Sequence, residues 1–240
     1  MRTNNTLLYS SHHFSLKLTL FTTIFCSLLF ITLPEIDLLF TGLFFEGENN
    51  FLLRNSSIHN FMDAWVRPSI KYLVMLLAAI TALSILSNGQ YIGWPIRNII
   101  FIISTFSLGP GLIVNGFLKE FIGRARPKNI VEFGGDKIFS PAYFPSDQCA
   151  HNCSFVSGDV AFAFATIAFP LLLSGMKKKV GILISIVFGM SIAFYRLGTG
   201  AHFLSDTVLA GLLSVITALF CYIIIIENPL LRNRTLGFDD

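Results

Sequence analysis

The sequence carries little charge: Asp, Glu, Lys and Arg together make up only 13% of its 240 residues. Globular domains contain about 25% of these residues, so the scarcity excludes a water-soluble domain. Nothing in the chain resembles a nucleic-acid-binding module. What remains is mostly apolar, with 53% hydrophobic residues and a mean hydropathy of +0.68, as expected of a membrane protein.

Internal repeats and low-complexity tracts are also missing, so internal symmetry gives no argument for a transporter. The first apolar stretch is not followed by an A-x-A cleavage pattern before Pro34. It is also longer than the ~7–15 apolar residues of a signal peptide. We therefore expect a retained membrane helix here, and a single membrane-embedded domain over residues 1–240.

Apolar runs recur along the chain at lengths close to the ~20 residues that cross a bilayer as a helix. The sequence thus predicts an all-α integral membrane protein with a bundle of six transmembrane helices, although one of the six could instead be buried or re-entrant. A tight hairpin is expected at 175–179, between the fourth and fifth runs. The runs cover residues 15–33, 70–87, 98–118, 158–175, 179–195 and 205–226.

Three polar segments interrupt the apolar sequence, each beside a different predicted membrane segment. They read K-E-F-I-G-R-A-R-P at 119–127, S-G-D at 157–159 and R-L-G-T-G-A-H-F-L-S-D at 196–206. Three fixed cations, one histidine and a carboxylate four residues beyond it suit the capture of a phosphate and attack on its phosphorus.

The spacing within the segments gives local expectations. Lys119 and Arg126 are seven residues apart, so they lie on one face if helix continues between them. Ser157 and Gly158 precede an apolar run, where free backbone N–H groups at a helix start would bind an anion. Each piece alone also has an ordinary explanation, since cations that flank a membrane segment are common anchors.

His202 and Asp206 stand at positions i and i+4. On a helix this spacing lets the carboxylate hold one imidazole nitrogen while the other faces a substrate. A plain contact on a helix surface has the same spacing. The joint occurrence of the three segments, in this order, favours the functional interpretation.

Together the segments resemble the signature of the type-2 phosphatidate phosphatase superfamily, K-x6-R-P, then P-S-G-H, then S-R-x5-H-x3-D. The resemblance spans residues 100–225, and its third part is the most specific. Three positions depart from the signature: Tyr195 replaces serine, Val156 replaces proline and Asp159 replaces histidine. The positions that match are Lys119, Arg126, Pro127, Ser157, Gly158, Arg196, His202 and Asp206.

The resemblance implies metal-independent hydrolysis of a lipid phosphate through a phosphohistidine, without a cofactor. No cluster of carboxylates in the sequence suggests a two-metal phosphatase. His202 would be the nucleophile, and Asp206 would fix its tautomer. The expected phosphate-binding residues are Lys119, Arg126, Ser157, Gly158 and Arg196.

Asp159 leaves the leaving-group chemistry open, because an aspartate with an ordinary pKa of ~3.9 is ionised at neutral pH. Burial could raise that pKa, His151 could supply the proton, or the leaving group could need little protonation. Asp159 could also simply pair with a phosphate-binding cation. An undemanding leaving group favours lipid A 1-phosphate or undecaprenyl diphosphate as substrate. Phosphatidylglycerol phosphate and phosphatidate stay open, as do a lipid phosphotransferase and a lipid or anion transporter.

Sidedness follows from Lys and Arg in the connections. Once the three site cations are set aside, the side that holds the N-terminus and Lys177–Lys179 carries more of them. This predicts a bacterial inner-membrane protein whose site faces the periplasm, together with loops 34–69 and 119–157. An oxidising periplasm would permit a disulfide between Cys149 and Cys153. Two free thiols, or two cysteine ligands to a metal ion, are the alternatives. Loop 34–69 is either an amphipathic segment at the bilayer interface or a folded cover.

Overall fold

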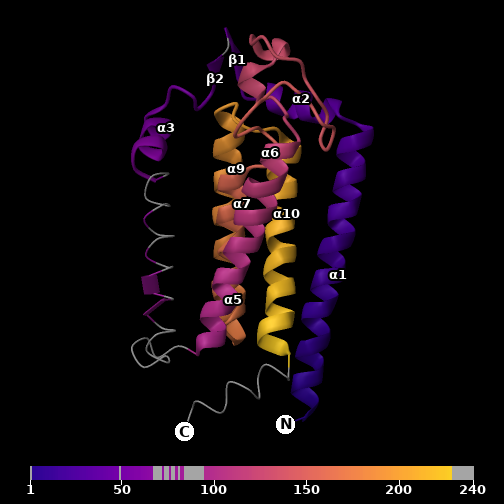
Figure 1. Ribbon diagram of the computed structural model, residues 1–240, viewed down its shortest axis with the longest axis vertical. Helices are drawn as coiled ribbons and strands as arrows, with labels where there is room; N and C mark the ends of the chain where they lie inside the picture. Colours follow the sequence, from indigo (N-terminus) through magenta and orange to yellow (C-terminus); the bar gives the residue numbers. More distant parts are fainter. Residues whose placement is uncertain are drawn as a thin grey trace.

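The computed structural model describes residues 2–48, 50–66 and 95–228, and isolated positions between 66 and 95. Long helices run side by side along the molecule, and a compact cap lies at the end away from the N-terminus (Figure 1). Helix α1 spans Arg2–Thr32, α9 spans Gly175–Gly198, and α10 spans Leu204–Cys221. A wider π-helical end, η5, extends α10 over Tyr222–Glu227.

A further long helix is built from α5 (Ile96–Phe106), the π-helical η2 (Ser107–Leu118) and α6 (Lys119–Phe121). Pro110 lies inside η2 and has no N–H to donate, which disturbs the regular helical ladder. The side-chain amide of Asn115 donates to the carbonyl oxygen of Pro110 at 2.6 Å. This bond ties the side chain of Asn115 to the backbone of the same π-helical segment, one wide turn before it.

Four helices in the described part of the chain are long and apolar enough to cross a bilayer. The predicted run 158–175 is shorter than expected: α7 (Gly158–Ala165) and α8 (Ala168–Leu171) form an apolar helical stretch over Gly158–Leu171 with a break between them. The predicted run 70–87 lies outside the described residues except for isolated positions. The four long helices are Ser11–Thr32, Ile96–Phe121, Gly175–Gly198 and Leu204–Glu227.

The hairpin expected at 175–179 is wrong in position. Helix α9 already begins at Gly175 after Ser174, so Lys177–Lys179 lie in its first turns and the connection is made by residues 172–174. The all-helical expectation also has one exception, an antiparallel pair of short strands, β1 (Phe45–Gly47) and β2 (Asn50–Phe51).

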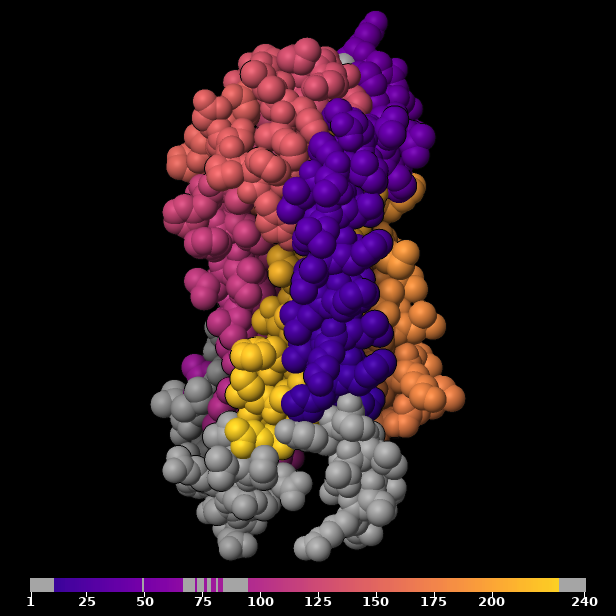
Figure 2. Space-filling view, turned by 90° about the vertical axis from the view of Figure 1, so that its right-hand side faces the viewer, coloured from indigo at the N-terminus to yellow at the C-terminus, as the bar shows by residue number. Residues whose placement is uncertain are grey.

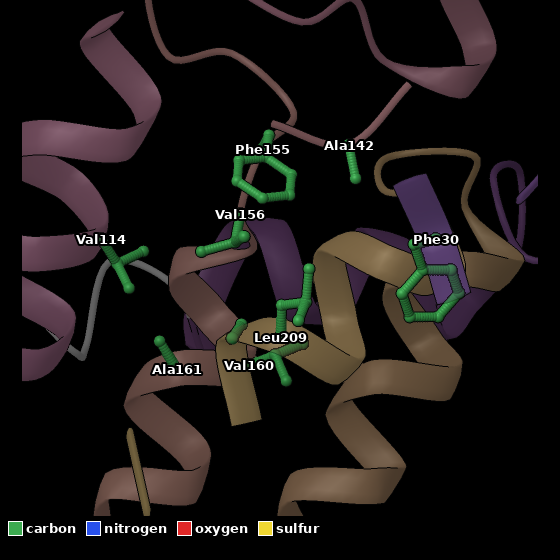
Figure 3. Close-up of a cluster of buried hydrophobic side chains, with 9 residues drawn as sticks. Phe30, Val114, Ala142, Phe155, Val156, Val160, Ala161 and Leu209 are labelled. Atoms are coloured by element: carbon green, nitrogen blue, oxygen red, sulfur yellow. The ribbon is translucent and has the colours of Figure 1, made fainter. Parts of the chain in front are cut away.

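Helix α10 is the centre of the bundle and contacts α1, α7, α9 and the α5–η2 helix. Small side chains along it, such as Ala210, Gly211 and Ser214, allow neighbouring helices to approach closely. Figure 3 shows the buried cluster beneath the cap, to which loop residue Val156 contributes together with α7 and α10. Its members are Phe30, Val114, Ala142, Phe155, Val156, Val160, Ala161, Leu209 and Ala210.

The cap is made by loop 34–66 and by the connection 122–157, which lie together over one end of the helices (Figure 2). Loop 34–66 contains α2 (Glu35–Gly42), the β1–β2 hairpin, α3 (Ser57–Phe61) and η1 (Met62–Val66). Two short 3-10 turns, η3 (Pro127–Asn129) and η4 (Val131–Phe133), belong to the connection. Phe44, Phe51 and Phe133 pack there in one cluster with Leu197 and Phe203, so the first loop is a folded cover.

Candidate active site

The three polar segments meet at the capped end of the bundle, because α6 and α9 end there while α7 and α10 begin there (Figure 1). Helix α6 ends at Phe121, so the condition for Lys119 and Arg126 to share one helix face, a helix that continues between them, is not met. The two cations are linked instead through Asn152, which lies in the connection 122–157. Nζ of Lys119 donates to the side-chain oxygen of Asn152 at 3.0 Å, and a terminal nitrogen of Arg126 donates to the backbone oxygen of Asn152 at 2.8 Å.

Asn152 lies in a tight turn that a disulfide between Cys149 and Cys153 closes. Its backbone has φ of 51°, the left-handed region that asparagine tolerates better than most residues. The disulfide and this local conformation hold both oxygens of Asn152 toward the two cations. His151, a proposed proton donor, has a side chain that is 88% exposed, with Nδ1 3.6 Å from Glu120.

His202 is almost completely buried just before α10. Its Nδ1 donates to the backbone carbonyl of Ser154 at 2.7 Å and lies 3.6 Å from Oδ2 of Asp206. A distance of 3.6 Å is too long for a hydrogen bond. The carbonyl of Ser154 therefore fixes the proton on Nδ1 and leaves the lone pair on Nε2. We expected Asp206 to fix the tautomer of His202, whereas in the structure the Ser154 carbonyl accepts from Nδ1 and Asp206 lies 3.6 Å away.

Asp206 is instead the centre of a hydrogen-bond network. Its Oδ2 accepts from the Ser154 hydroxyl at 2.5 Å and from the backbone N–H of Phe203 at 2.9 Å. Its Oδ1 accepts from Arg124 at 2.7 Å. The carboxylate thereby caps the start of α10 and holds the residue whose carbonyl orients His202.

Arg124 lies fully buried between two buried carboxylates. One terminal nitrogen donates to Asp206 and to the Ser205 hydroxyl, and the other donates to Asp37 on α2 at 2.8 Å. The guanidinium also lies 4.1 Å from the ring centroid of Phe203. Asp37 in turn accepts from the backbone N–H of Ser205 at 2.8 Å, so the network joins the cap to the start of α10.

Arg196 lies at the end of α9, and its Nη1 is 3.3 Å from Oδ2 of Asp159 in the first turn of α7. Beside it, the buried hydroxyl of Ser157 has no hydrogen-bond partner among the described residues. Gly158 has a packing role, since a Cβ there would lie 2.6 Å from the Asn115 side chain. The start of α7 thus combines an uncommitted hydroxyl with the first backbone N–H groups of a helix, which have no acceptor within the helix.

The surroundings keep the His202 imidazole neutral. Burial disfavours the imidazolium and lowers the pKa of His202, and the charges of Arg196 and Lys119 lower it further. The effect of Asp206 is opposite but smaller than that of burial. A neutral ring with a free lone pair on Nε2, in the field of two cations, can attack an electron-poor phosphorus atom.

Several residues of the site were not predicted: Arg124, Asp37, Ser154 and Asn152. Arg124 stands two residues before Arg126 in the first segment, and a second arginine there was the available signal. Asp37 stands between Ile36 and Leu38 in the first loop, and a carboxylate flanked by apolar residues was the available signal of a buried partner. Ser154 and Asn152 act partly through backbone oxygens, which carry no residue-type signal.

Residues 100–229 match the PAP2 superfamily, which covers more than half of the chain. The fold, the site and this match define a multi-pass membrane protein with a lipid phosphatase site. The chain belongs to the PAP2 superfamily, so the resemblance to type-2 phosphatidate phosphatases is confirmed.

Individual relatives give a more specific likeness. The chain is 32% identical over 219 residues to a lipid A 4′-phosphatase of Francisella tularensis subsp. novicida (strain U112), a match that covers 87% of this chain and 95% of that protein. It is 37% identical over 115 residues to a lipid A 4′-phosphatase of Rhizobium leguminosarum, covering about half of each chain (48% and 49%). No solved structure matches the chain. The protein is a lipid phosphatase that hydrolyses a membrane lipid phosphate.

Proposed function

We propose that this protein removes the 4′-phosphate of lipid A at the periplasmic face of the bacterial inner membrane, through a phosphohistidine at His202. The observation that carries the mechanism is the buried neutral imidazole, whose Nδ1 is bound to the Ser154 carbonyl. The substrate assignment comes from the similarity to lipid A 4′-phosphatases over nearly the whole chain.

In the first step Nε2 of His202 forms a bond to phosphorus while the bond from phosphorus to the sugar oxygen breaks. The leaving oxygen takes up a proton and departs as an alcohol. Lys119, Arg126 and Arg196 neutralise the phosphoryl oxygens, and the Ser157 hydroxyl donates to one of them. Water then attacks phosphorus, the bond to nitrogen breaks, and one proton of the water is lost as phosphate leaves. His202 returns to its neutral form.

The position of the phosphate bears on the role of Asp159. We expected an anomeric 1-phosphate from the chemistry of the leaving group, whereas the relatives are 4′-phosphatases. A sugar alkoxide at the 4′ position needs a proton more than an anomeric oxygen does. The ion pair between Asp159 and Arg196 supports a positioning role for this carboxylate, and the proton then comes from a different group or from water.

Asp159→Asn tests this role. We expect a similar loss, about 10-fold, for lipid A and for an activated aryl phosphate, because the weakened Arg196 geometry affects phosphate binding in both. Initial rates for the two substrates, measured on the purified variant, give the comparison. A loss confined to lipid A would show that Asp159 protonates the leaving oxygen. Asp159→His, which restores the usual family residue, should then widen the range of monoesters accepted.

An apolar cavity beside the site supports a lipid as the substrate. It has a volume of about 380 Å³ and lies between α9 and α10, within the membrane-spanning part of the bundle. Its lining is almost entirely apolar and includes Phe164, Met190, Phe194 and Val208. Leu197 and Thr207, which also line it, directly follow Arg196 and Asp206 in sequence. We infer that one acyl chain of the substrate lies here while its phosphate is in the site.

Sealed right-side-out membrane vesicles that contain the protein test activity and sidedness together. With lipid A added from outside and chelator present, we expect release of inorganic phosphate and loss of the 4′ group, identified by mass spectrometry. Activity seen only after the vesicles are opened would place the site on the cytoplasmic side. Loss of the 1-phosphate, or transport of intact labelled lipid without phosphate release, would contradict the proposed function.

A further inference from the structure

Two basic residues beside the predicted phosphate-binding residues have no role in the reaction described above. Lys128 follows Arg126 by two residues within the turn η3, and its side chain is half-buried. Arg54 follows strand β2 in the cap and is also partly buried. Arg54 belongs to loop 34–66 and Lys128 to the connection 122–157, so only the folded cap places the two residues near each other.

Backbone hydrogen bonds fix both residues to the segment between α9 and His202. The N–H of Lys128 donates to the carbonyl of Gly200 at 3.0 Å, and the N–H of Leu53, next to Arg54, donates to the carbonyl of Gly198 at 2.8 Å. Gly198 permits the second contact, since a Cβ there would lie 2.7 Å from the Leu53 side chain. Lys128 and Arg54 are therefore held against the same turn that carries the nucleophile.

The charges around Lys128 are mainly of its own sign. Burial lowers the pKa of Lys128, and the nearby cations Arg126, Arg54 and Arg196 lower it further, while Asp63 acts in the opposite direction. Among the residues that the structure describes, the Lys128 ammonium forms neither a hydrogen bond nor an ion pair. A half-buried ammonium among charges of its own sign is unfavourable unless an anion joins it.

A polar cavity of about 370 Å³ opens beside this group and is large enough for a sugar phosphate or carboxylate. Arg126, a predicted phosphate-binding residue, lines this cavity together with Asn152, to which it donates, so the cavity adjoins the predicted phosphate site. The lining residues that carry polar side chains are Arg126, Lys128, Asn129, Gln148, His151 and Asn152.

We propose that Lys128, supported by Arg54 and Arg126, forms a second anion subsite that binds another phosphate or carboxylate of the same lipid headgroup. The inference rests on the proposed function and adds to it: the substrate is a lipid with two anionic groups, of which only one is hydrolysed. Arg126 lies between the two subsites, and Lys128 faces the group that stays on the lipid.

The test compares lipid A phosphorylated at both the 1 and 4′ positions with lipid A phosphorylated only at the 4′ position, each in neutral bilayers. The wild-type protein should have a KM about 10-fold lower for the doubly phosphorylated lipid, the size of one charge-assisted contact. Lys128→Met should abolish this preference by raising the KM for that lipid alone. The kcat and KM for the singly phosphorylated lipid should stay unchanged, and Lys128→Arg should retain the preference.

Lys137→Met is the matched control, because Lys137 lies in the same connection but pairs with Asp136 on the exposed surface. It should leave the preference intact. An equal loss on both lipids in Lys128→Met would overturn the proposal and make Lys128 part of the first phosphate site. Restoration of tight binding by phosphatidylglycerol added to the bilayer with the singly phosphorylated lipid would also overturn it, because the anion would then come from a neighbouring lipid.

Binding of the two lipids to the inactive His202→Ala variant, measured without turnover, separates this inference from the proposed function. If no phosphate is released by the wild type, the proposed function fails. A preference of about 10-fold for the doubly phosphorylated lipid that Lys128→Met removes would still support the second subsite. Equal binding of both lipids would exclude it.

Discussion

Replacement of His202 by alanine is expected to lower hydrolysis of lipid A on the order of 10⁶-fold, the loss seen when a hydrolase loses its nucleophile. The reason is geometric: the imidazole presents an unprotonated Nε2 among the cations, because the Ser154 carbonyl fixes the proton on Nδ1. The measurement is phosphate release by the purified variant. Rapid quenching with labelled substrate should also trap a phosphohistidine in the wild type and none in the variant.

His12→Asn is a suitable control, since His12 lies on α1 at the opposite end of the bundle, hydrogen-bonded to Lys178 and Glu227. It should keep full activity and the labelled intermediate. The His202→Ala protein should elute and unfold like the wild type, because alanine leaves the Asp206 network in place. Turnover above about one thousandth of the wild-type rate in this variant would exclude His202 as the nucleophile.

Arg124→Met should have the largest effect on stability, a loss of about 3–5 kcal/mol in the free energy of unfolding. The change leaves the buried carboxylates of Asp37 and Asp206 without their shared cation. Activity should fall as well, since Asp206 holds the Ser154 hydroxyl and thereby the orientation of His202. Chemical or thermal unfolding of the protein in detergent, followed together with phosphate release, measures both effects.

Arg126→Met is the matched comparison, because Arg126 is partly exposed and donates to a backbone oxygen, that of Asn152. It should lose activity with a change in stability below about 1 kcal/mol. The double variant Arg124→Met, Asp37→Asn should be more stable than the sum of its two single variants, because each change removes part of the other's penalty. Strict additivity would mean that Arg124 and Asp37 are not coupled in the folded protein.

The sequence predicted the long helices well where apolar runs were unbroken. The fifth run, predicted at 179–195, is helix Gly175–Gly198, and the sixth, predicted at 205–226, is Leu204–Glu227. The prediction of one helix over 158–175 was less accurate, because apolar composition alone does not reveal a local break in a helix. There the Thr166 hydroxyl donates a hydrogen bond to the carbonyl of Ala163. Helix α7 ends at Ala165, and α8 begins at Ala168.

The site was predictable as a set of residue types but not as a set of contacts. The motif spacing identified His202 and Asp206, which lie close together, and Arg196, which pairs with Asp159. Spacing failed for Lys119 and Arg126, whose link runs through Asn152 in a different segment. It could not find the pairing of Arg124 with Asp37, because 87 residues of chain separate them. Long-range pairing of this kind follows from the packed bundle and leaves no periodic trace.

The bond between Asp37 and the backbone of Ser205 joins residues 168 positions apart. A chain inserted into the membrane from its N-terminus therefore carries an unfinished site through most of its synthesis. The cap residues can complete the network around Arg124 only after the start of α10 has been made, with His202 just before it. Until that segment emerges, Arg124 and Asp37 lack their partners Asp206 and Ser205, so this buried network is completed only late in synthesis.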